Sequence, residues 1–127
     1  MQSYFLIFAG GGLGAVSRHL VGMASLRVLG PGFPFGTIAV NVVGSFLMGL
    51  LIGWLAQRAA GGQDLRLFLA TGFLGGFTTF SAFSLDAITL WERGATTSAA
   101  GYVLGSVILS ILAVFFGLAI ARAAFAG

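Results

Sequence analysis

Short hydroxyl side chains alternate with phenylalanines in the stretch TGFLGGFTTFSAFSLD, residues 71–86. A hydroxyl donates and accepts hydrogen bonds, and the edge of an aromatic ring carries partial positive charge. Phe80 and Phe83 share a helix face, as do Ser81 and Ser84, because each pair is three residues apart. The pattern predicts a place where a small polar species binds or passes. Ordinary packing is the competing interpretation in a chain with 13 phenylalanines.

Three glycines, Gly72, Gly75 and Gly76, come directly before most of these hydroxyls. Glycine loosens a helix because it has no Cβ, and irregular backbone within a membrane must be buried in protein or line a cavity. We therefore expect a helix that is broken near residues 73–79. Carbonyl groups freed by such a break are a recurrent cation site in membrane proteins.

Asn41 is the most polar side chain of an apolar segment further upstream. An unpaired amide in hydrocarbon costs several kcal/mol, so Asn41 must bond to another helix or to a passing ligand. It belongs to a stripe with a four-residue repeat, and the last apolar segment carries a second such stripe: Thr37, Asn41, Ser45, and Tyr102, Ser106, Ser110. Hydrogen bonding between helices and lining of a pore both explain these stripes, although their number beside a broken helix favours a polar track.

The expected track has neutral donors and no lysine. Its amide, hydroxyls and ring edges suit a small, strongly hydrated anion, and the lack of a full positive charge there keeps binding weak enough for conduction. Hydroxyls also accept hydrogen bonds, so a cation is the alternative. Arg18 and His19 interrupt the first apolar segment. Arg18 either has a vestibule or structural role near the pore mouth, or is a plain anchor at the membrane interface.

Enzyme and nucleotide-binding motifs are missing from the sequence. It contains neither a GxSxG elbow nor a histidine cluster, and its GGGLG run lacks the GxGxxG spacing. The few arginines are typical of residues that flank membrane spans, not of a nucleic-acid-binding surface. A proton-coupled small exporter remains a competitor, for which only Asp86 or Arg18 could be the coupling group, and a purely structural membrane subunit is the third hypothesis.

Composition assigns these residues to a membrane protein. The chain has 127 residues, of which 58% are hydrophobic and 7% charged, with a mean hydropathy of +1.06; soluble domains carry roughly a quarter charged residues. About 20 apolar residues cross a bilayer, so four spans fill the chain as one all-α domain, residues 1–127. We expect the spans at about residues 4–26, 36–56, 65–91 and 99–121.

The arginines give no preferred orientation in the membrane. With the four spans as predicted, three arginines lie on each side: Arg58, Arg66 and Arg122 on one, and Arg18, Arg27 and Arg93 on the other. Because arginine bias sets topology, a chain without bias should insert both ways. This balance predicts an antiparallel homodimer of inverted copies.

The sequence resembles the Fluc (CrcB) fluoride channels along nearly its whole length. The resemblance rests on GGGLGAVSR in the first span, GTIAVNVVGSFLMG in the second, TGFLGGFTTFSAFS in the third and the hydroxyl stripe of the fourth. It implies a passive, fluoride-selective channel of the bacterial plasma (inner) membrane that protects the cell by exporting fluoride. It also implies a dual-topology antiparallel dimer with two pores. Fluoride, the lipid bilayer and a second copy are the expected partners, with no nucleic acid or other protein.

The resemblance also suggests roles for individual residues. Phe80 and Phe83 correspond to the phenylalanines that line the fluoride path, and Asn41 corresponds to its donor on the second span. The remaining polar positions of the track are Tyr102, Ser110, Thr37, Ser81 and Ser84.

A structural sodium ion at the dimer interface is a further implication of the resemblance. Its ligands in the family are backbone carbonyls of the third-span break, which correspond to Gly75 and Thr78. Arg18 matches the arginine of the first span. The sequence departs from the family at Ala82, where a hydroxyl is common, and at Asp86, where glutamate is common.

Overall fold

Four helical stretches, each long and apolar enough to cross a membrane, make up the computed structural model, which describes residues 2–58 and 62–125. They are Gln2–Leu29, Phe35–Leu55, Gln63–Glu92 and Thr96–Phe125. The described residues contain no strand, so the predicted all-α class and the four membrane-capable helices are confirmed. The first and fourth helices extend several residues beyond the predicted spans, and part of the loop before Gln63 lies outside the described residues.

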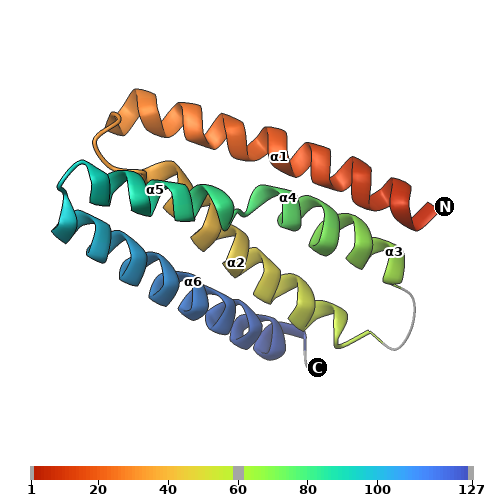
Figure 1. Ribbon diagram of the computed structural model, residues 1–127. Coiled ribbons are helices and arrows are strands. Elements are labelled where there is room, and N and C mark those ends of the chain that lie inside the picture. The colour runs from red at the N-terminus through yellow and green to blue at the C-terminus, as the bar shows by residue number, and fades with distance from the viewer. Residues whose placement is uncertain (1, 59–61, 126–127) are drawn as a thin grey trace.

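The first helix, α1 (Gln2–Leu29), is followed by Gly30, whose φ of 79° lies in the left-handed region that favours glycine and ends the helix. A loop with two prolines leads into α2 (Phe35–Leu55), and the last helix is α6 (Thr96–Phe125). Figure 1 shows α1 and α6 at the two edges of the bundle, with α2 and the third helical stretch between them.

The third stretch is divided into shorter elements. It begins with α3 (Gln63–Leu65), continues as the π-helix η1 (Arg66–Leu74) and α4 (Gly75–Phe77), and resumes as α5 (Ser81–Glu92). Residues 78–80 between α4 and α5 are not helical, and Thr78 is extended, with φ −86° and ψ 159°. The non-helical residues thus begin after the three glycines, whereas the sequence placed the break at residues 73–79.

Two glycines of the third stretch, Gly72 and Gly76, allow close packing against α1. A Cβ at Gly76 would collide with the carbonyl oxygen of Gly11, and one at Gly72 would lie 3.1 Å from the Cα of Gly10. A Cβ at Gly14 would collide with the carbonyl oxygen of Phe73. Here α1 crosses η1 and α4 with backbone against backbone, as small residues permit in membranes.

A second glycine contact joins α2 to α6. A Cβ at Gly49 would lie 3.1 Å from the Cα of Gly117, and the reverse substitution gives the same distance. By contrast, a Cβ at Gly101 or Gly105 would meet no other atom within 4 Å among the described residues, although the two glycines form a GxxxG pair. The two close contacts, α1 on η1 and α4, and α2 on α6, fix the frame on which the polar residues sit.

Candidate ion pathway

A cavity of about 260 Å³ lies where α2, residues 78–80, α5 and α6 meet. We call it the hydroxyl cavity. Its polar and aromatic lining comprises Asn41, Ser45, Thr78, Thr79, Phe80, Phe83, Ser106 and Ser110. These residues come from three membrane-capable helices and face one space, so the structure brings the predicted residues Asn41, Phe80, Phe83 and Ser110 together.

The side chain of Asn41 holds the non-helical residues in place. Its Nδ2 donates to the carbonyl oxygen of Thr79 at 3.0 Å, and its Oδ1 accepts from the backbone N–H of Thr79 at 2.8 Å. The amide therefore satisfies both backbone groups that Thr79 would otherwise leave unpaired. Asn41 meets the pairing requirement of a buried amide through the backbone of this turn.

The two phenylalanines of the cavity differ sharply in exposure. Phe83 is 8% exposed, whereas Phe80 is 77% exposed in the single chain. Their ring centroids are 5.6 Å apart, and the ring of Phe83 lies 5.2 Å from that of Tyr102. Phe83 belongs to the wall of the bundle, and Phe80 projects from it.

Ser106 contributes a hydroxyl with unused hydrogen-bonding capacity. It is 4% exposed, lines the hydroxyl cavity, and its Oγ has no partner among the described residues. Buried polar atoms are usually paired, so an unpaired one that faces a cavity points to a ligand or water there.

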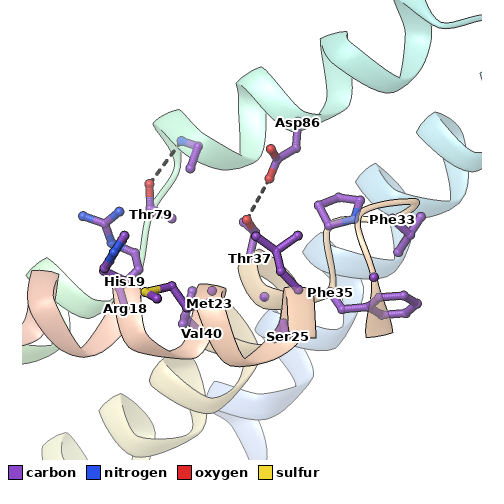
Figure 2. Close-up of a pocket in the computed structure, with 16 residues that line it drawn as sticks. Arg18, His19, Met23, Ser25, Phe33, Phe35, Thr37, Val40, Thr79 and Asp86 are labelled. Atoms are coloured by element: carbon purple, nitrogen blue, oxygen red, sulfur yellow. Dashed lines mark hydrogen bonds between the residues drawn. The ribbon is translucent and has the colours of Figure 1, made fainter. Parts of the chain in front are cut away.

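A second cavity, of about 360 Å³, lies between the later half of α1, the loop before α2, and α5. We call it the vestibule. Figure 2 shows Arg18 and His19 beside Thr79 on one side, and Thr37 with Asp86 on the other. Thr79 lines the vestibule and the hydroxyl cavity alike, so the two spaces meet at this residue.

Asp86 collects two hydroxyl donors beside the vestibule. Thr37 Oγ1 donates to Asp86 Oδ2 at 2.7 Å, and Tyr102 donates to the same oxygen at 3.0 Å. Tyr102 is fully buried, and Phe33 of the loop before α2 meets its ring edge-on, with the centroids 5.5 Å apart. The carboxylate therefore orients hydroxyls from two other helices.

Arg18 reaches the third helical stretch across the α1 contact. Its Nε donates to the carbonyl oxygen of Gly76 at 3.1 Å, and the residue lines the vestibule. The fourth residue after Gly76 is Phe80, which lies beyond the end of α4, so this carbonyl has no helical partner. The guanidinium satisfies it and places positive charge at the vestibule.

Two other carbonyls at the end of α4 lack donors. Among the hydrogen bonds of the described residues, none reaches the carbonyl oxygens of Gly75 or Thr78, because Thr79 donates to Asn41 and the N–H of Ala82 donates to Thr79 Oγ1. Gly75 is exposed on the surface of the chain. Such groups require a partner within a membrane.

A protein-family model described as "CrcB-like protein, Camphor Resistance (CrcB)" matches residues 5–118 of this chain. The chain belongs to the CrcB family. A protein from Mesorhizobium japonicum named fluoride-specific ion channel FluC is 59% identical over 96% of this chain and 98% of its own length. Its namesakes from Agrobacterium fabrum and Rhodopseudomonas palustris are 57% and 56% identical over the same shares.

Membership in the CrcB family confirms the family named by the sequence motifs. Together with four membrane-capable helices, it makes the chain a multi-pass membrane protein. The relatives are named as ion channels, in agreement with the expectation that the chain is not an enzyme.

Four residues assigned from the CrcB resemblance lie away from the hydroxyl cavity. Tyr102 and Thr37 bond to Asp86, Ser84 Oγ donates to the carbonyl of Phe80 at 2.9 Å, and Ser81 is exposed at the start of α5. Their assignment to the pathway stays a prediction.

Three residues to which the family resemblance gave no pathway role also lie at these cavities. Ser45 and Ser106 line the hydroxyl cavity, and Asp86 organises the hydroxyls beside the vestibule. Both serines already belong to the four-residue stripes that favour a polar track in the sequence.

Ser106→Ala is expected to raise stability while weakening ion binding. Removing an unpaired buried hydroxyl relieves a desolvation penalty of about 1 kcal/mol. The same change deletes a buried cavity donor that has no partner among the described residues, so flux of the conducted ion should fall. Thermal melting of the purified protein and flux from liposomes would measure the two effects, with Thr89→Ala as the matched control, because the Thr89 hydroxyl bonds to the Leu85 carbonyl within its own helix, outside the proposed path. Equal flux in both variants would argue against a ligand at Ser106.

Proposed function

We propose that this protein is a passive, fluoride-selective ion channel. The observation that carries the proposal is the hydroxyl cavity, in which Asn41, the phenyl rings and the unpaired Ser106 hydroxyl converge between membrane-capable helices. Relatives 56–59% identical to the chain are named fluoride-specific ion channels.

The chemistry of the cavity favours a small anion. Ser106 and Ser110 supply hydroxyl donors, and ring edges supply partial positive charge without fixing the ion strongly. A strongly hydrated ion must exchange its water for such donors. Fluoride, as the smallest halide, gains most from short hydrogen bonds to hydroxyls, whereas chloride requires a wider space.

The proposed path leads from the vestibule to the hydroxyl cavity. Arg18 attracts the anion at the vestibule, and Thr79 stands where the two spaces meet. Asp86 keeps the hydroxyls of Thr37 and Tyr102 directed toward itself, so we assign these two residues a supporting position beside the path. Ser81 and Ser84 lie in the first turn of α5, directly after Phe80, and complete the proposed polar track.

The proposed assembly is an antiparallel dual-topology homodimer with two pores. Its support is the high exposure of Phe80 on the same side as the cavity, and the even distribution of arginines between the two ends. In this arrangement a second copy covers Phe80 and closes the open side of the hydroxyl cavity.

A structural sodium ion fits the third helical stretch. The unpaired carbonyls of Gly75 and Thr78 would hold it, with equivalent carbonyls from the second copy. Oxygen ligands suit a hard cation, and no group of three His, Cys, Asp or Glu side chains that could hold a metal occurs among the described residues. When bound, the ion would compensate two backbone dipoles and link the copies.

We place the channel in the bacterial plasma (inner) membrane, where it lets accumulated fluoride leave the cell.

Release of fluoride from liposomes tests the proposed function. Purified protein in vesicles loaded with potassium fluoride should release the ion rapidly once valinomycin balances the charge, as followed with a fluoride electrode. Vesicles loaded with chloride should retain it. Release only under an imposed proton gradient would instead support the second candidate, a proton-coupled exporter, for which Asp86 in the vestibule lining would be the coupling group. Absence of release under both conditions would support a structural subunit.

A further inference from the structure

An apolar cavity of about 440 Å³ lies between the later half of α2, η1 and the end of α6. We call it the leucine groove. Its walls include Leu50, Leu51, Trp54, Leu69, Phe73 and Phe125. Leu50 follows Asn41 by nine residues, so at 3.6 residues per turn it lies about half a turn away from Asn41 around α2. The groove therefore faces away from the hydroxyl cavity and from the exposed ring of Phe80.

Three arginines lie where α2 ends, η1 begins and α6 ends, and these elements also form the groove. Arg58 follows Trp54 by four residues, and its Cζ lies 4.9 Å from the centroid of the tryptophan ring. Arg66 precedes Leu69 by three residues in η1, and Arg122 precedes Phe125 by three residues in α6, so each lies close in the chain to a residue of the apolar wall. All three are exposed. Asp64 is the one acidic residue near them in the sequence, which leaves this end of the groove positively charged.

We propose that the leucine groove binds an acyl chain of an anionic glycerophospholipid whose headgroup is held by Arg58, Arg66 and Arg122. Basic clusters beside transmembrane helices recognise anionic headgroups. Trp54 is of the type that marks the membrane interface, so the arginines stand at headgroup level while the groove extends toward the hydrocarbon. Stacking on Trp54 fixes the Arg58 guanidinium and leaves its N–H groups free for phosphate.

Charge favours a lipid over a second copy of the chain as occupant. Arg18, Arg27 and Arg93 lie toward the opposite end of the molecule, where they outnumber Asp86 and Glu92. A second copy would thus bring a net positive end to the three arginines in either orientation. An anionic lipid complements both the apolar wall and the positive end.

Quenching of tryptophan fluorescence by brominated lipid tests the proposal. The chain has two tryptophans, so Trp91→Phe leaves Trp54, a wall of the groove, as the sole emitter. The variant is reconstituted into vesicles of phosphatidylcholine and phosphatidylglycerol in which one or the other carries brominated acyl chains. Brominated phosphatidylglycerol should quench several-fold more than its mole fraction predicts. Equal quenching by both lipids would mean that the groove accepts any acyl chain, and would overturn the proposal.

Substitutions of arginine separate headgroup recognition from general lipid contact. Arg58→Gln in the Trp91→Phe background should reduce the preference for phosphatidylglycerol about fivefold, which corresponds to loss of one headgroup arginine, and Arg58→Lys should restore part of it. Arg27→Gln removes the same charge from the far end of α1 and should leave the preference unchanged. An equal loss of preference in both glutamine variants would show that the preference depends only on the net charge of the protein. Protection of Trp54 from both brominated lipids would show that protein covers the groove. Either result refutes the proposal.

Discussion

Asn41→Asp is expected to lower fluoride flux by more than about a hundredfold. The carboxylate retains the acceptor for the Thr79 N–H but loses the Nδ2 donor, so the Thr79 carbonyl is left unpaired at about 1–3 kcal/mol. A carboxylate that is ionised also repels an anion about 4 Å away by about 4 kcal/mol at an effective dielectric constant of 20. Each 1.4 kcal/mol in a barrier is about a factor of ten in rate. Fluoride release from liposomes measures the effect.

Two companion variants separate the contributions of charge and geometry. Asn41→Leu removes both hydrogen bonds to Thr79 without adding charge, so flux should also be lost, through a displaced turn at residues 78–80. Ser45→Ala, one turn further along the same cavity wall, leaves the bonds intact and should retain most of the flux. Wild-type flux in a normally assembled Asn41→Asp protein would remove Asn41 from the pathway.

The helical frame could be predicted from the sequence because membrane insertion depends on local composition. Each of the four apolar segments is long enough to span the bilayer alone, and the structure places a membrane-capable helix at each one. The helix ends were less predictable. Apolar length gives the minimum for a span, whereas α1 and α6 continue past it with residues that can remain helical in the headgroup region.

The position of the helix interruption depended on tertiary contacts. Glycine content predicted residues 73–79, but Gly72 and Gly76 lie in helical turns that press against α1. The non-helical conformation begins at Thr78 because Asn41 of α2 offers Thr79 the two hydrogen bonds that a helix would have supplied. A glycine that loosens a helix and one that allows close approach look identical in a sequence.

The residues of the candidate pathway also divide into those that local sequence predicts and those whose position depends on tertiary contacts. Asn41, Phe80, Phe83 and Ser110 were predictable because residue type and helical spacing placed them on facing stripes. The orientations of Thr37 and Tyr102 were not, because both hydroxyls follow the Asp86 carboxylate, whose distance from them in the chain is 49 and 16 residues. Which hydroxyls bond to a given carboxylate depends on which helices pack beside one another.

Gly14→Ala is expected to lower the melting temperature by about 10 °C, because α1 must move away from its neighbours. The added Cβ would collide with the carbonyl oxygen of Phe73 and lie 2.8 Å from the backbone N of Phe77, and neither backbone atom can rotate away as a side chain would. Overpacking of this kind costs about 1–3 kcal/mol, and about 3–4 °C of melting temperature accompanies each kcal/mol in a chain of this size. Size-exclusion chromatography of heated detergent samples gives the melting temperature.

Gly12→Ala provides the matched comparison two residues away on the same helix. A Cβ at Gly12 would meet nothing within 4 Å in residues 2–58 and 62–125, and alanine is the better helix former by about 0.5–1 kcal/mol, so the melting temperature should hold or rise. Displacement of α1 at Gly14 would also draw Arg18, one turn further on, away from the carbonyl of Gly76. Gly14→Ala should therefore lose flux at temperatures where it is still folded, whereas Gly12→Ala keeps it. Identical melting of the two variants would show that the α1 contact yields without strain.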